Sequence, residues 1–159
     1  MARGSAGSWL EGPGSGRPAA VDDAPGASLG LPAAGTGSVA GQGRRALGFL
    51  YDVLAALVVG AALRLVDRGV GSGTVGLTQT GFLLAEVLVL QVLGGASVGQ
   101  RFAGTRLVSV YGGGRPRARW VLLRTFLLAL PVPGAAALAT DADGRGLHDR
   151  AAGTVVVRA

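Results

Sequence analysis

A carboxylate lies inside an apolar segment that is long enough to cross a membrane. Residues 46–63 read ALGFLYDVLAALVVGAAL, and Asp52 is the only charged residue among them. About 18 apolar residues in a helix, at about 1.5 Å per residue, span most of the roughly 30 Å hydrocarbon core of a bilayer. A carboxylate at that depth is costly unless it is paired, protonated or hydrated. The sequence therefore predicts a membrane protein in which Asp52 has a partner or a function.

The composition agrees with a membrane location and excludes several kinds of site. The chain of 159 residues has a mean hydropathy of +0.46, and it contains no cysteine, so disulfides and thiolate metal sites are excluded. His148 is the only histidine, which excludes a multi-histidine metal site, and we predict no metal and no cofactor. Lysine, asparagine and isoleucine are absent beside abundant glycine and alanine, which indicates a GC-rich bacterial genome.

The net charge of +6 indicates what the chain contacts, and every one of its 15 basic residues is arginine. A basic protein can bind nucleic acid, but in a chain this hydrophobic the charge favours a bilayer with anionic headgroups. We therefore predict a lipid partner and no nucleic acid.

Two long apolar segments follow a polar N-terminal region. Residues 1–43 are dominated by glycine, alanine, serine and proline, which bury too little apolar surface to fold, so they predict a disordered tail. Apolar runs predict helices over about 44–65 and 81–98, joined by a glycine-rich loop over 68–80. The transmembrane domain is predicted to cover residues 44–159.

A third apolar stretch, residues 120–140, is broken by proline at its centre. Pro131, Pro133 and Gly134 predict two short helices, over about 119–130 and 134–140, that form a re-entrant hairpin. A kinked full span is the alternative. The hairpin is preferred because it returns TVVV (154–157) to the side of RLVSV (106–110), with which it can form a small two-stranded sheet. The predicted fold is thus an all-α membrane protein with two transmembrane helices and this small cytoplasmic sheet.

The arginines also predict the orientation. Two of them precede the first helix, and five lie in the segment 99–119 after the second helix, which has no acidic residue. The positive-inside rule then places the N-terminus and that segment in the cytoplasm of a multi-pass plasma-membrane protein.

Charges inside the apolar segments are expected to hold the helices together. Arg45 lies seven residues before Asp52, so both share one helix face, about 10 Å apart along the axis. Arg124 is the predicted partner of Asp52, since it also lies in an apolar stretch that starts on the cytoplasmic side. A role for Asp52 in ion or proton coupling is the alternative. Asp149 is expected to pair with arginines of the 99–119 segment.

Small residues predict close helix packing. Gly95 and Gly99 form a GxxxG pattern at the end of the second predicted helix. We expect this face to pack against the first helix.

These residues resemble the bacterial RDD family of multi-pass membrane proteins, which is named for one arginine and two aspartates. Arg45, Asp52 and Asp149 match the three named residues, and the resemblance covers about residues 44–158. The most specific part is GLHDRAAGTVVV (146–157). The segment GASVGQR (95–101) keeps only the two glycines of the Gly-Gln-Thr-Pro-Gly-Lys pattern common in that family. The resemblance implies a membrane fold and key residues rather than a reaction.

Two classes of function remain. No pairing of a nucleophile with a base is apparent, so an enzyme is not predicted. The first class is a small structural or accessory membrane module, which packs through its internal charges against a second copy or another membrane protein. The second is an oligomeric transporter or channel subunit for cations or protons that uses Asp52, since two spans cannot enclose a pathway alone.

Overall fold

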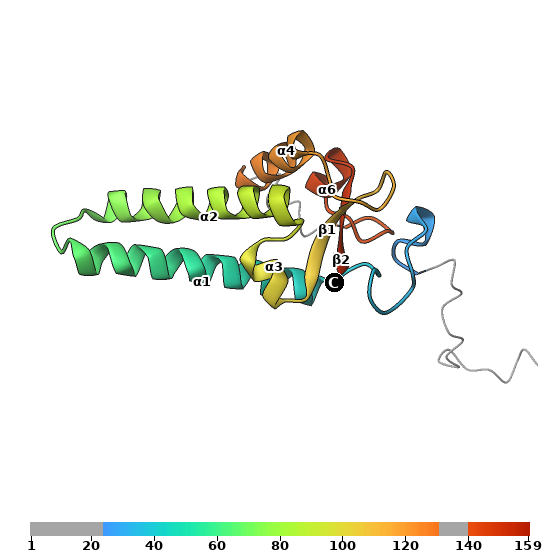
Figure 1. Ribbon diagram of the computed structural model, residues 1–159, viewed down its shortest axis with the longest axis horizontal. Helices are drawn as coiled ribbons and strands as arrows, with labels where there is room; N and C mark the ends of the chain where they lie inside the picture. The colour runs from blue at the N-terminus through green and yellow to red at the C-terminus, as the bar shows by residue number, and fades with distance from the viewer. Residues whose placement is uncertain (1–23, 131–139) are drawn as a thin grey trace, which may run out of the picture.

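A helical hairpin projects from a small mixed base in the computed structural model, which describes residues 24–130 and 140–159 (Figure 1). The hairpin consists of α1 (Gln42–Val66) and α2 (Ser72–Gly94), which lie side by side and are joined at the far end by residues 67–71. Among the described residues, the base contains one 3₁₀ turn, three short helices and two strands: η2 (Ala27–Leu29), α3 (Val98–Phe102), β1 (Thr105–Ser109), α4 (Ala118–Ala129), α6 (Leu147–Ala151) and β2 (Thr154–Arg158).

Both hairpin helices are long and apolar enough to cross a membrane, as the sequence predicts. Their large side chains point outward and are mostly exposed, for example Phe49, Val58 and Leu77 at 63%, 68% and 78%. The buried positions of α1 recur at every fourth residue: Gly48, Asp52, Ala56 and Gly60. This spacing forms one stripe along the helix, and the small residues in it let neighbouring backbones approach closely.

The second helix differs from its prediction at both ends. The segment 68–80 was expected to be a glycine-rich loop, but most of it belongs to α2. Each glycine costs a helix up to about 1 kcal/mol. Packing against α1 outweighs that cost, because Val75 is buried and the side chain of Gln79 lies over Gly60. The helix ends at Gly94 rather than at Val98, since Gly95 has a positive φ of 74° and caps it.

The predicted small sheet is confirmed. β1 and β2 pair antiparallel, with Leu107 opposite Val156. Leu107, Val156, Val121 of α4 and Ala40 form one buried cluster, against which Leu88 and Val92 of α2 pack. The sheet therefore joins the base to the end of the hairpin.

The chain before α1 also contacts the sheet, which corrects part of the prediction of a disordered tail. Val39 forms a β-bridge with Val157, and the backbone N–H of Ala40 donates to the carbonyl of Val156. Backbone N–H and C=O groups at the free edge of β2 are thereby satisfied. The remainder of the predicted tail, residues 1–23, lies outside the described residues.

The third apolar segment is described only in its first half. α4 ends at Ala129, one residue from the predicted end of the first short helix, and Leu130 has an extended backbone. The residue before a proline disfavours the helical conformation, which explains this end. The second predicted helix, over 134–140, falls almost entirely on residues outside the described part.

Truncation of Leu107 tests the buried cluster. Leu107 is 1% exposed, so Leu107→Ala should lower the free energy of unfolding by about 2–5 kcal/mol through the cavity that it leaves. The matched control is Leu77→Ala on the outer face of α2, where the side chain is 78% exposed. Thermal unfolding of the purified variants in detergent measures both effects, and equal losses would contradict the assignment of the cluster as core.

Candidate functional site

The buried charges of the chain gather at the junction between the hairpin and the base. Asp52 is 4% exposed and Asp149 is fully buried. Each carboxylate lies in a separate cluster, one around the first turn of α3 and the other between α1, α4 and α6.

Asp52 binds the first turn of α3. Its carboxylate accepts hydrogen bonds from the Ser97 hydroxyl at 2.7 Å and from the Gly99 backbone N–H at 2.5 Å. Ser97 also caps α3, where its side chain accepts from the N–H of Gln100. A β-carbon on Gly99 would collide with the Gly48 carbonyl and lie 2.7 Å from the Asp52 carboxylate. A glycine is therefore required where α3 meets α1.

Glu86 binds the same turn from α2. One carboxylate oxygen accepts from the backbone N–H of Val98 at 2.7 Å. Two successive amides, those of Val98 and Gly99, thus donate to carboxylates from the two long helices. Gln91 adds a third contact, because its amide nitrogen donates to the side chain of Gln100 at 3.1 Å. α3 therefore connects α1 to α2 through buried polar groups.

Asp149 lies between two arginines from different helices. Its Oδ1 accepts from Nε of Arg124 at 2.8 Å, and its Oδ2 accepts from Nη1 of Arg45 at 3.2 Å. The three residues come from α6, α4 and α1, and Asp149 lies 104 positions after Arg45 in the sequence. Arg45 also donates to the backbone carbonyls of Ala40 and Val156. One side chain thereby fixes the entry into α1, strand β2 and helix α6.

The protonation states at Asp149 follow from its surroundings. Burial alone would raise the pKa of Asp149, but its neighbours, Arg124 foremost, then His148 once it is protonated at low pH, and then Arg45, bring that pKa below its ordinary value. His148 lies beside it, with Nε2 3.4 Å from Oδ1 of Asp149 and 3.5 Å from Nη2 of Arg124. Burial lowers the pKa of His148 to about 4, so the imidazole is neutral at pH 7.

The two expected ion pairs of the predicted site are replaced by others. Arg124 was predicted to pair with Asp52, but it pairs with Asp149, while Asp52 accepts from two uncharged donors. Asp149 was expected to bind arginines of the 99–119 segment, but its partners are Arg45 and Arg124. The pair of Arg124 with Asp52 was predicted because both residues lie in apolar segments that start on the cytoplasmic side. In the structure, Asp52 contacts α3 instead.

The two glycines of the predicted GxxxG pattern have different roles in the structure. Gly99 does pack against α1, as expected, whereas Gly95 lies outside the helix and forms its C-terminal cap. Ser97 and Glu86, which also belong to the site, were not predicted as site residues. The spacing Ser-x-x-Gln at 97–100 is a capping-box signature and marks the start of α3.

Potential metal ligands do not cluster in the part of the chain that the structure describes. Among residues 24–130 and 140–159, no three histidine, cysteine or acidic side chains are close enough together to hold an ion. No family model matches this sequence, and no match is found among curated proteins or solved structures. The two buried charge clusters and the hairpin are therefore the features from which a function can be inferred.

Substitution of Asp149 tests the first cluster. Asp149→Asn leaves Arg45 and the nearly buried Arg124 without a counter-charge, which should lower the free energy of unfolding by about 3 kcal/mol or more. Asp67→Asn, in the exposed turn between α1 and α2, removes the same charge as a control. Thermal unfolding in detergent should separate the two variants clearly, and similar melting temperatures would contradict a structural role for Asp149.

The lowered pKa of His148 predicts a pH dependence. Between about 4, the folded value, and the ordinary value of 6.5, the unfolded chain binds a proton that the folded protein does not. Stability from this residue is therefore present above pH 6.5 and is lost as the pH falls towards 4, by about 3 kcal/mol in total. Asp149 adds nothing in this window, because its own contribution is lost only at lower pH.

His148→Gln should remove this part of the pH dependence. The measurement compares melting temperatures of wild type and variant in steps from pH 7 to pH 4.5, because any other titrating groups contribute to both proteins. Parallel curves over that range would show that His148 is not held neutral in the folded protein.

Proposed function

We propose that this chain is a small RDD-type integral membrane protein of the bacterial plasma membrane with a structural or accessory role. The observation that carries the proposal is the hairpin of α1 and α2. Its outer surface carries exposed large apolar side chains, while the polar side chains of Asp52 and Gln91 are buried near the base. Exposure of such an apolar surface to water is unfavourable, whereas its contact with the hydrocarbon core of a bilayer is not.

The positions that resemble the RDD family support this proposal because α1 contacts both of the other regions that carry the resemblance. Arg45 forms an ion pair with Asp149, and Asp52 accepts hydrogen bonds from the turn within the 95–101 segment. The first of these contacts joins residues that lie 104 positions apart. A shared architectural role accounts for all of them together.

An accessory role is preferred because both oxygens of the Asp149 carboxylate are already bound by arginines of the same chain. Asp149 has two arginine partners, and the neutral His148 adds no further positive charge. Such a cluster fixes how α4 and α6 dock on the hairpin, and it needs no ligand to do so. The chain would then act by packing its apolar outer surface against lipid and against a second copy or another membrane protein, and not as an enzyme.

Cation or proton transport by an oligomer is the second candidate, and Asp52 favours it. Among the described residues Asp52 has only uncharged donors, and the second carboxylate oxygen of Glu86 is buried without a hydrogen-bond partner. Carboxylates of this kind bind protons or cations in transport proteins. Two helices cannot enclose a pathway, so this role requires several copies.

The proposed topology places the base, with its basic segment 99–119, in the cytoplasm. The third apolar segment is proposed to re-enter rather than to cross, because β1 and β2 lie on either side of it in sequence and pair in one sheet. A full span would separate the two strands by the bilayer.

Single cysteines test this topology, since the natural chain has none. Gly71→Cys lies at the far end of the hairpin and Gly114→Cys lies in the turn after β1, and both positions have open space for a side chain. A membrane-impermeant maleimide added to intact cells should label Gly71→Cys and leave Gly114→Cys unlabelled until the cells are opened. Labelling of both before lysis would contradict the proposed membrane location, and the reverse pattern would contradict the orientation.

Flux measurements separate the two candidate functions. Proteoliposomes that contain wild type should show no more cation or proton flux than empty liposomes if the role is structural. Asp52→Asn should then lower only the melting temperature and the membrane abundance, since one acceptor of the α3 turn is weakened. Flux that is present in wild type and in the control Asp67→Asn, but lost in Asp52→Asn, would establish the transport role instead.

A further inference from the structure

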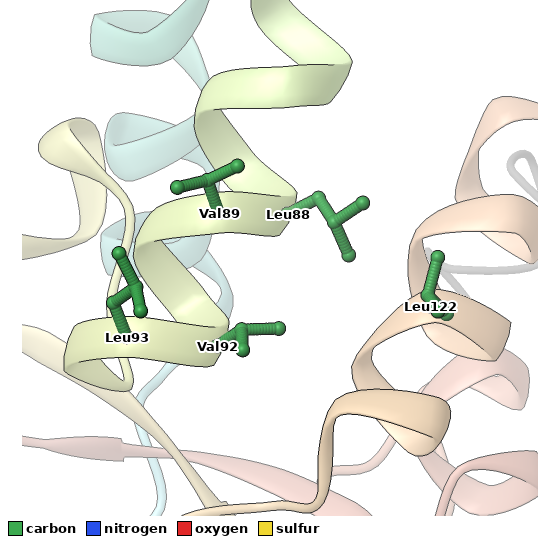
Figure 2. Close-up of a pocket in the computed structure, with 5 residues that line it drawn as sticks. All are labelled: Leu88, Val89, Val92, Leu93 and Leu122. Atoms are coloured by element: carbon green, nitrogen blue, oxygen red, sulfur yellow. The ribbon is translucent and has the colours of Figure 1, made fainter.

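An apolar groove runs along the base-proximal half of α2 and is closed on one side by α4. It has a volume of about 280 Å³, and five aliphatic side chains line it: Leu88, Val89, Val92, Leu93 and Leu122. Figure 2 shows four of these side chains on successive turns of α2 and Leu122 on α4 across the groove. No polar residue contributes to the lining.

The groove suits a hydrocarbon chain in both chemistry and size. An apolar cavity of about 150 Å³ is enough to stay dry and to bind benzene in another protein. The larger groove therefore accommodates a short run of methylene groups. Its lining extends along α2 from Leu88 to Leu93, which is about 8 Å along the helix axis and parallel to the proposed membrane normal.

Two arginines lie near the base end of the same groove. The side chain of Arg115 lies 3.9 Å from the β-carbon position of Gly95. Arg119 comes three residues before Leu122 on α4, so both share one helix face.

Both arginines are exposed. Within the described ranges, no acidic side chain forms an ion pair with Arg115 or Arg119, so their positive charges are not neutralised by the protein. Arg119 lies over the ring of Trp120, with 4.9 Å from its guanidinium carbon to the ring centre. Tryptophan beside arginine is typical of the level of the lipid headgroups.

We propose that this groove binds one acyl chain of an anionic phospholipid, whose phosphate is bound by Arg115 and Arg119. The inference rests on the proposed membrane location and adds a specific lipid site to it. An anionic lipid fits better than a second copy of this chain, because the arginines at the groove end require a negative partner, whereas another copy would bring further arginines close to them. The apolar lining and the two arginines together match the two parts of one lipid molecule.

Lipid retention measured by native mass spectrometry tests the site. Protein in mild detergent is titrated with phosphatidylglycerol, with phosphatidylcholine of the same acyl chains, and with glycerol phosphate as the headgroup alone. Wild type should bind phosphatidylglycerol roughly tenfold more tightly than phosphatidylcholine and should not retain glycerol phosphate. Equal binding of the two lipids, or equal binding of glycerol phosphate, would overturn the proposal.

Variants assign this binding to the groove. The double change Arg115→Gln with Arg119→Gln should weaken phosphatidylglycerol binding roughly tenfold or more, since each arginine near the headgroups adds about a fivefold preference. The control is Arg64→Gln with Arg68→Gln, which removes two exposed arginines at the far end of the hairpin and should leave binding unchanged. Val89→Trp fills the groove and should weaken both lipids. Equal losses in the control pair, or unaffected binding in Val89→Trp, would place the lipid elsewhere.

A second measurement does not depend on the variants being well folded. The chain has two tryptophans, so Trp9→Phe leaves Trp120 as the only one. Phosphatidylglycerol with brominated acyl chains should quench Trp120 fluorescence more than brominated phosphatidylcholine does, and equal quenching would contradict the site. A dimer mass that Val89→Trp converts to monomer would show that a second copy fills the groove. Failure of membrane integration would be detected separately by the cysteine labelling and would overturn the proposed function itself.

Discussion

The base of this molecule depends on the ion pairs that the buried carboxylate of Asp149 forms with two arginines. This carboxylate joins α6 to Arg124 of α4 and to Arg45 of α1, and Arg45 in turn holds the carbonyls of Ala40 and Val156. Two arginines around one carboxylate leave an excess positive charge, and a protonated imidazole beside them would increase it. Burial keeps His148 neutral there at pH 7, so the histidine adds no positive charge to the cluster.

A second constraint acts where α3 meets the hairpin. Carboxylates from both long helices, Asp52 and Glu86, accept hydrogen bonds from adjacent backbone amides of a single turn. Glycine is required at position 99, because a β-carbon there would collide with α1. The stripe of small residues along α1 continues this contact toward the far end of the hairpin. The angle between the hairpin and the base is thus set by buried hydrogen bonds rather than by apolar packing alone, and in a bilayer such bonds would face no competition from water.

The two clusters lie at one end of the molecule, and the exposed apolar surface extends from them in one direction (Figure 1). In the proposed membrane orientation, this segregation puts the ionised groups near the cytoplasmic interface and leaves hydrocarbon-facing side chains over the remaining length. The groove beside α4 then opens at the boundary between these two regions, where the arginines and Trp120 lie. A lipid bound there would place its charged headgroup beside the polar region of the protein and its acyl chain beside the apolar region.

The sequence by itself determined the parts that depend on neighbouring residues. Runs of apolar residues indicated two helices long enough to span a membrane, three consecutive valines indicated the strand that pairs with residues 105–109, and Pro131 indicated where α4 stops. It also singled out Arg45, Asp52, Arg124 and Asp149 as internal charges. Only the tertiary structure decided which of them meet. Pairing between residues 25 to 104 positions apart depends on how helices dock, and neither charge nor depth along a helix encodes that docking. The glycine-rich start of α2 shows the same limit, because contacts with α1 overcame the local preference for a loop.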